Sequence, residues 1–220
     1  MLTKSPPIIK INGKTIGLGH APYIVAEMSG NHNLDLNRAL KIIDAAKAAG
    51  ADAVKFQVFK SASLVGKQSS DYQKLKTLEL DDKTLIRFRD LARGIGLKFG
   101  CSVFCDESIK IVSDIDLDFI KIASSEFTNA RICQQALRLG IPIVVSTGMA
   151  DALDVQIFLY NFSGIIGSDL ALPHCTTEYP CPIQRLDLSS ITHLNAQHNV
   201  VAGFSDHSEE LTTGAFAWCL

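Results

Sequence analysis

The chain has 220 residues, of which 47% are hydrophobic and 20% charged, enough apolar material for one large globular domain rather than a disordered protein. A formal net charge of −2 supplies no basic surface, so we expect no nucleic-acid partner. No apolar run approaches the roughly 18 residues of a membrane span, and the first ten residues lack the apolar stretch of a signal peptide. We therefore expect a cytoplasmic protein with no membrane partner. Its six scattered cysteines match no zinc-finger spacing and should be reduced.

The N-terminal segment predicts a β-hairpin. Two short apolar runs, 8–11 and 14–16, flank Asn12-Gly13, the dipeptide typical of a type I′ turn. We interpret residues 1–20 as a hairpin that caps the bottom of the catalytic domain formed by residues 21–220.

After the hairpin, short apolar runs alternate with segments of helical periodicity. The first strand, 23–26, stops at Glu27, and the first helix, 39–49, stops at Gly50. Further strands are predicted at 53–57, 97–102, 118–122, 142–145, 170–172 and 200–204. Further helices are predicted at 81–94, 106–112, 129–140, 152–162 and from 214 onward. The polar connection 60–80 is long for a compact domain, which favours a functional loop.

This alternation is typical of βα units and a parallel sheet. We predict a TIM-type (β/α)8 barrel whose eighth βα unit is missing from the chain, because a closed barrel has eight units and about 250 residues. An open, doubly wound sheet is the alternative, but no glycine-rich dinucleotide fingerprint follows the first strand.

Polar side chains recur where the predicted strands end, which in a barrel is the catalytic mouth. They are Glu27, Lys55, Gln57, Ser102, Ser124, Glu126, Ser146, Thr147, His174, Ser205, Asp206 and His207. A single such serine is usually a helix cap, a single lysine a solvated charge, and a single histidine a structural residue. Recurrence at six or seven strand ends favours a site. Hydroxyls with a lysine suit a phosphate, and carboxylates with histidines suit a divalent metal or acid–base chemistry.

Six segments resemble the sialic acid synthase family, in the family's order. They are 24–33 (IVAEMSGNHN), 50–57 (GADAVKFQ), 121–126 (KIASSE), 146–149 (STGM), 174–180 (HCTTEYP) and 203–208 (GFSDHS). The resemblance covers the chain from about Pro22 to its last residue. It implies a (β/α)8 barrel that condenses phosphoenolpyruvate with an N-acetylated aminosugar of the N-acetylmannosamine type, with Mn²⁺ or Mg²⁺, to form a nine-carbon sugar and phosphate.

The resemblance also implies roles for individual residues. The phosphoenolpyruvate-binding groups would be Lys55, Ser102, Ser124, Ser146 and Ser205. Thr177 would lie toward the phosphate, Tyr179 would contact the sugar, and Gln57 is a further substrate-binding candidate at its strand end. Glu27 and Glu126 would be the catalytic carboxylates, and His207 one of two metal-binding histidines. We expect Glu27 to bind sugar hydroxyls, and Glu126 to stabilise positive charge at C2 or to orient the attacking water.

Three departures from the family pattern affect these expectations. Cys101-Ser102-Val103-Phe104 replaces the usual Ser-Thr-Pro-Phe but keeps a hydroxyl, and the loop after the second strand is shorter than expected. No eighth-strand motif with the second metal histidine occurs, nor a C-terminal antifreeze-like domain, so we interpret the chain as truncated inside its last helix. The family's homodimer depends largely on that domain, which leaves the oligomeric state open.

Other interpretations stay open at this point. The product could be N-acetylneuraminate, legionaminate or pseudaminate. The chain could also be a non-catalytic phosphosugar-binding protein with an incomplete barrel. A general aldolase on the same barrel is disfavoured, because neither Lys55 nor Lys121 has an obvious neighbour in sequence that would lower its pKa.

Overall fold

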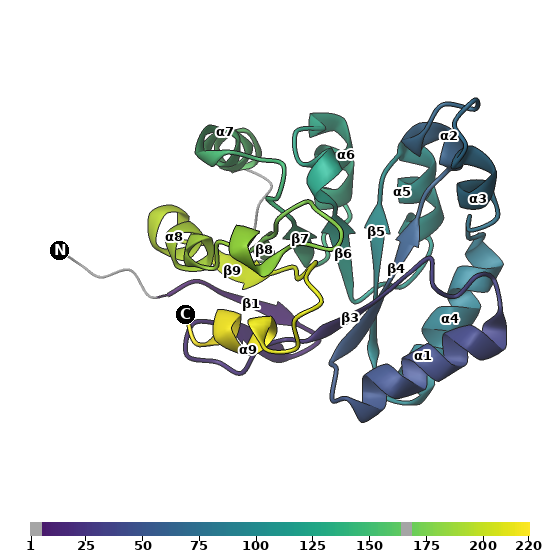
Figure 1. The fold of residues 1–220 in the computed structure, drawn as a ribbon, viewed down its shortest axis with the longest axis horizontal. Coiled ribbons are helices and arrows are strands. Elements are labelled where there is room, and N and C mark those ends of the chain that lie inside the picture. The colour runs from purple at the N-terminus through teal and green to yellow at the C-terminus, as the bar shows by residue number, and fades with distance from the viewer. Residues whose placement is uncertain (1–5, 164–168) are drawn as a thin grey trace. The chain divides into compact units, whose positions relative to one another are not determined.

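The computed structural model describes residues 6–163 and 169–220 in two compact units (Figure 1). One unit is Tyr23–Lys121; the other combines Met1–Pro22 with Ile122–Leu220. Residues 1–5 of the predicted hairpin segment lie outside the described residues. Among the described residues, no helix is both long enough and apolar enough to cross a bilayer.

In the Tyr23–Lys121 unit, parallel strands are neighbours in chain order. The strands are β3 (Val25–Ser29), β4 (Ala53–Val58), β5 (Lys98–Val103) and β6 (Phe119–Ile122), whose last residue belongs to the other unit. The helices are α1 (Leu36–Ala48), α2 (Ser61–Leu64), α3 (Tyr72–Lys76), α4 (Asp82–Gly94) and α5 (Asp106–Ser113). Helices α1 and α4 lie side by side against the strands (Figure 1).

The two faces of these strands carry different side chains, aromatic on one face and polar on the other. Phe56 of β4 stacks on Phe88 of α4 with ring centroids 4.9 Å apart, and also contacts Phe99 of β5, so this face forms the core beneath the helices. Side chains alternate along a strand, so Lys55 and Gln57 lie on the opposite face. Gly100 pairs with Lys55 and has no room for a side chain, since a Cβ there would lie 2.3 Å from the Phe119 ring.

The hairpin prediction is confirmed. Strands β1 (Ile8–Ile11) and β2 (Lys14–Gly17) pair antiparallel. Asn12 and Gly13 both have positive φ, 47° and 83°, as a type I′ turn requires. Its role as a cap for the bottom of the barrel stays a prediction.

The second unit continues the βα alternation with parallel neighbours. Its strands are β7 (Ile143–Val145), β8 (Leu170–His174) and β9 (Val201–Phe204). Its helices are α6 (Ala130–Leu137), α7 (Ala152–Phe162), α8 (Ser189–His198) and α9 (Thr213–Trp218), with 3-10 turns η1 (Ser124–Glu126) and η2 (Ile183–Arg185). The Ser146 amide donates to the Ile122 carbonyl at 3.0 Å, which joins the ends of β7 and β6.

The structure differs from the sequence prediction at the end of the first strand and in the connection 60–80. The first strand does not stop at Glu27: β3 runs on to Ser29, with a register shift between Glu27 and Ser29 and a φ of 49° at Ser29. Connection 60–80 is not one structureless loop, because it contains α2 and α3. The cysteines are free, as predicted: five are buried and Cys219 is exposed.

Candidate active site

Lys55 is the centre of the first group of predicted residues. Its side chain is on β4, is only 9% exposed, and forms an ion pair with Glu27 of β3. The Lys55 ammonium also donates to the Ser102 hydroxyl of β5 at 2.7 Å. Strand register produces this contact set, because Glu27 pairs with Lys55 in β3–β4 and Gln57 pairs with Ser102 in β4–β5. Four predicted residues therefore meet on three adjacent strands.

Burial decides the electrostatics of this group. An ammonium taken out of water is costly unless a charge and hydrogen bonds compensate it, and Glu27 and Ser102 do so here. The Glu27 side chain stays 46% exposed and also accepts from the Ser29 amide at 2.9 Å, so the irregular end of β3 fixes it. The result is a buried cation whose carboxylate partner is open to solvent.

Ser124 and Ser146 belong to a second group, at the ends of β6, β7 and β8. The Ser124 hydroxyl accepts from the Gly148 amide at 3.2 Å and lies 3.0 Å from Cys175 Sγ. Ser146 is 3% exposed, and its amide donates to the Ile122 carbonyl, two residues before Ser124. Gly148 permits this packing, because a Cβ there would lie 2.4 Å from Cys175 Sγ and 2.7 Å from the Cys175 carbonyl.

Glu126 is half-buried, and within the described part of the chain its carboxylate is held by neighbours in sequence. Its carboxylate accepts from the Asn129 amide group at 2.8 Å and from the Ser125 hydroxyl at 3.2 Å. Both of these donors are neutral, in contrast to the lysine that neutralises Glu27.

His207 and Tyr179 form a third group. Their rings stack with centroids 4.0 Å apart, and Tyr179 Oη lies 2.9 Å from His207 Nε2. His207 Nδ1 lies 2.7 Å from the Thr176 carbonyl, so both ring nitrogens have partners. Thr177 is exposed, and Ser205 is anchored by its amide to the His174 carbonyl at 2.8 Å.

The sequence profile of the NeuB family matches residues 42–220. The chain belongs to the NeuB family. It is 34% identical over 218 residues to the N,N′-diacetyllegionaminic acid synthase of Legionella pneumophila, covering 90% of this chain and 61% of that protein. It is 29% identical over 201 residues to the pseudaminic acid synthase of Helicobacter pylori, covering 85% of this chain and 59% of that protein. The chain thus spans about three fifths of these curated relatives.

A solved structure is also similar. The crystal structure of an N-acetylneuraminic acid (sialic acid) synthetase from Leptospira borgpetersenii, in complex with citrate, matches with a TM-score of 0.91 and 27% identity, covering 96% of this chain and 74% of that one. The likeness confirms the predicted fold class: strands β3 to β9 of this NeuB chain form a seven-stranded sheet that matches part of a TIM-type barrel. The family resemblance found in the motifs is confirmed as well.

The described residues of the NeuB chain do not assemble a complete metal site. Outside residues 1–5 and 164–168, no group of three or more His, Cys, Asp or Glu side chains could hold a metal ion. His207 contributes one imidazole, whose nitrogens contact Tyr179 and Thr176. Mn²⁺ or Mg²⁺ dependence therefore stays a prediction, and we derive no chemical step through a metal.

Cys175 is a site residue that sequence reasoning missed. It is buried and contacts Ser124. A cysteine among apolar residues gives no sequence signal for such a contact, apart from the fact that Cys175 lies in the 174–180 segment. His174, next to it, has a buried Nε2 without a hydrogen-bond partner among the described residues. Burial lowers the pKa of His174, and the nearby Asp187 charge opposes that shift, so its imidazole is neutral at neutral pH.

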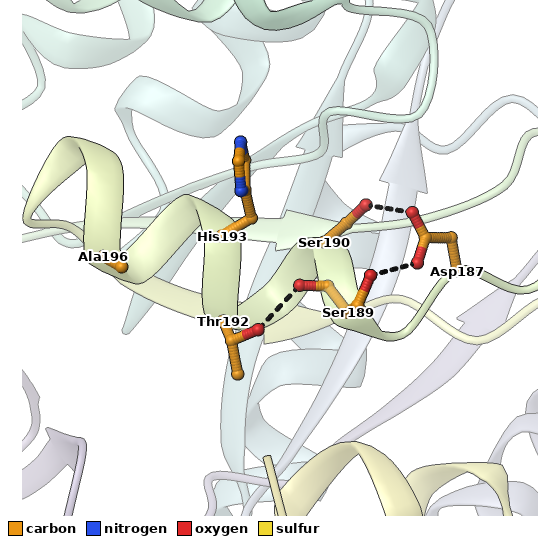
Figure 2. A pocket seen from close by; sticks show the side chains of 6 residues that line it. All are labelled: Asp187, Ser189, Ser190, Thr192, His193 and Ala196. Carbon is orange, nitrogen blue, oxygen red and sulfur yellow. Dashed lines mark hydrogen bonds between the residues drawn. The ribbon is translucent and has the colours of Figure 1, made fainter.

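A pocket along α8 is lined by none of the predicted residues (Figure 2). Asp187 accepts from the hydroxyls of Ser189 and Ser190, at 2.5 and 2.9 Å. These bonds lower the pKa of Asp187. Because both carboxylate oxygens accept from hydroxyls at the start of α8, we interpret the arrangement as a local contact at this helix end rather than a ligand site.

Proposed function

We propose that the protein condenses phosphoenolpyruvate with an N-acetylated aminosugar of the N-acetylmannosamine type, forming a nine-carbon sialic-acid-like sugar and releasing phosphate. Family membership and the names of the relatives support this class of reaction. The observation that carries the proposal is the buried Lys55 ammonium, held between Glu27 and Ser102 on adjacent strands. Legionaminate and pseudaminate precursors are the alternative acceptors.

Lys55 suits an anionic substrate. A phosphate or carboxylate oxygen can replace Glu27 as the partner of the ammonium, while the Ser102 hydroxyl offers a second contact. The exposed side of Glu27 lets its carboxylate move away or turn toward a sugar hydroxyl as the anion enters. Ser124, Ser146 and Ser205 are the further hydroxyls that we assign to phosphoenolpyruvate.

The chemistry explains the need for carboxylates. C3 of phosphoenolpyruvate attacks the aldehyde carbon of the open-chain sugar, which forms the new C–C bond, opens the C=O double bond to an alkoxide and leaves positive charge at C2. Water then adds at C2, and one of its protons goes to balance the alkoxide, which becomes a hydroxyl. The tetrahedral intermediate expels phosphate by breaking the C2–O bond, and the C2 hydroxyl gives up its proton as the ketone forms. We assign Glu126 to the charge at C2 or to the water, because an anion held only by neutral donors is best placed to stabilise a cation.

The test is phosphate release with phosphoenolpyruvate, N-acetylmannosamine and Mn²⁺, in wild type and in Lys55→Met. Release should require both substrates. Lys55→Met should lower the affinity for phosphoenolpyruvate by about thirtyfold or more, since truncating one member of a buried charge pair costs about 2–5 kcal/mol. Lys41→Met, at an exposed position of α1, is the matched control and should behave as wild type.

The outcomes separate the alternatives. If the protein bound phosphoenolpyruvate but released no phosphate with any aminosugar tried, the result would favour a phosphosugar-binding protein over a synthase. Release with a diacetylated aminosugar but not with N-acetylmannosamine would keep the reaction and change the product. Unchanged binding in Lys55→Met would remove Lys55 from the site.

A further inference from the structure

The segment of residues 60–79, which lies between the buried Phe59 and Leu80, has almost no core of its own. It carries α2 and α3, and among residues 60–79 Ser61 alone is buried. Apolar burial is what usually fixes such short helices, because helices of four or five residues are not stable by themselves. Polar contacts must therefore hold this segment in place.

Glu79 supplies those contacts. Its side chain is 10% exposed, and its carboxylate accepts from the Ser61 amide at 2.9 Å and from the Ser61 hydroxyl. The Lys76 ammonium donates to it at 2.9 Å, and Lys60 lies 3.5 Å away. One carboxylate thus joins the start of α2 to the end of α3, across 18 residues of chain.

The Glu79 carboxylate stays ionised, so its contacts with Ser61 and Lys76 persist over the working pH range. Burial alone would raise its pKa, but the hydrogen bonds from Ser61 and Lys76 outweigh burial and lower the pKa of Glu79 to about 2. The carboxylate is therefore ionised at any pH at which the protein is used, and the link does not act as a pH switch.

Leu78, beside Glu79, connects the segment to the predicted site. A Cβ built on Gly30 would lie 3.0 Å from Leu78 Cδ1, so Leu78 packs against the loop that follows β3. Gly30 is three residues after Glu27, and the segment itself begins three residues after Gln57. Figure 1 shows α2 and α3 beyond the end of β4.

We propose that Glu79 is a positioning residue that holds the 60–79 segment against the loop after β3, and so sets the side of the site that receives the sugar. The contacts of Glu79 that hold the segment are a property of the fold, whereas an effect of the segment on sugar binding rests on the proposed function. The segment should leave phosphoenolpyruvate contacts unaffected, because Lys55 and Ser102 are fixed on the strands themselves.

The experiment combines hydrogen exchange with binding. In Glu79→Ala, amides of residues 61–79 should exchange about tenfold or more faster, because a buried carboxylate and its charged hydrogen bonds are lost. Exchange elsewhere should stay unchanged. Phosphoenolpyruvate affinity should remain within about twofold, whereas kcat/KM for the aminosugar should fall about tenfold, mainly through KM. Glu79→Gln keeps an acceptor for Ser61 and should be intermediate.

Asp71→Asn is the matched control, because Asp71 precedes α3 in the same segment and its side chain makes no capping bond. Unchanged exchange at 61–79 in Glu79→Ala would overturn the link. Faster exchange with unaltered sugar kinetics, or parallel losses for both substrates, would overturn the positioning role. If wild type bound neither substrate, the proposed function would fail, while the exchange data would still decide whether Glu79 holds the segment.

Discussion

Glu27 and Glu126 differ in what holds their carboxylates, and the difference separates their roles. Glu27 is neutralised by Lys55, whereas Glu126 accepts from the neutral groups of Asn129 and Ser125. Placing a negative charge near a developing cation lowers the barrier only if that charge is not already compensated. Glu126 is therefore the better candidate for the group that faces C2.

Replacing Glu126 by Gln tests this role while keeping the shape of the side chain. Because Gln can still accept from Asn129, the 3-10 turn η1 should persist. We expect kcat to fall at least tenfold, with phosphoenolpyruvate affinity within about twofold of wild type, measured by single-turnover kinetics and calorimetry. Glu107→Gln, on the exposed face of α5, is the control. A variant that kept more than a tenth of wild-type turnover would remove Glu126 from the C2 step.

At the same scale, the sequence indicated which residues end strands but not which ones touch. Lys55, Glu27 and Ser102 could be predicted as neighbours of a common mouth, because they follow apolar runs. Their ion pair and hydrogen bond depend on strand register, which a sequence pattern leaves open. Glu79 gave no signal, because a glutamate in a polar connection looks like a solvated charge until its partners are known.

Among the elements, the loops after β7 and β8 approach each other so closely that a side chain at Gly148 cannot fit. Gly148→Ala should destabilise the protein by about 1–3 kcal/mol, the usual cost of overpacking, because the Cys175 backbone is part of the obstacle. Binding of phosphoenolpyruvate should weaken in parallel, since the Gly148 amide donates to Ser124. Urea unfolding and calorimetry measure the two effects.

Gly94→Ala is the matched glycine control for this experiment. Gly94 is the last residue of α4 and has no neighbouring atom within 4 Å of a built Cβ, so alanine should stabilise by up to about 1 kcal/mol. Equal stability in Gly148→Ala and wild type would show that the two loops can separate at no cost.

The helices that could be predicted are those with a cap and a clear apolar face. α4 begins after Asp81, whose carboxylate accepts from the Thr84 amide, and α7 spans Ala152–Phe162 as predicted. The sequence carries no clear signal for α8, which buries Ile191 and Leu194 and has no side-chain hydrogen bond at its N-cap Leu188. α2 and α3 were missed because tertiary contacts, above all those of Glu79, determine them rather than periodicity.

For the whole molecule, acid sensitivity should come in two steps. Burial lowers the pKa of His32, which is 1% exposed and packs against Phe56 and Phe88. The unfolded chain therefore binds a proton there below about pH 6.5 while the folded chain resists it, so stability falls as the pH drops. The pKa values of Glu79, Asp81 and Asp116 are also lowered, the first to about 2, so their contributions are lost only below about pH 4.

His174, whose pKa is also lowered, contributes to the same step, and the share of His32 can be measured by substitution. His32 Nδ1 accepts from the Leu34 amide at 3.0 Å, and the side-chain oxygen of Asn can take over that bond without titrating. Between pH 7.5 and 5.5 the wild-type unfolding midpoint should fall, by roughly 2–4 °C for each kcal/mol lost in a chain of this size. His32→Asn should fall clearly less, and His193→Asn, at an exposed position of α8, should follow wild type. Parallel curves for wild type and His32→Asn, recorded by calorimetry at constant ionic strength, would mean that His32 takes up its proton as readily in the folded protein as in the unfolded chain.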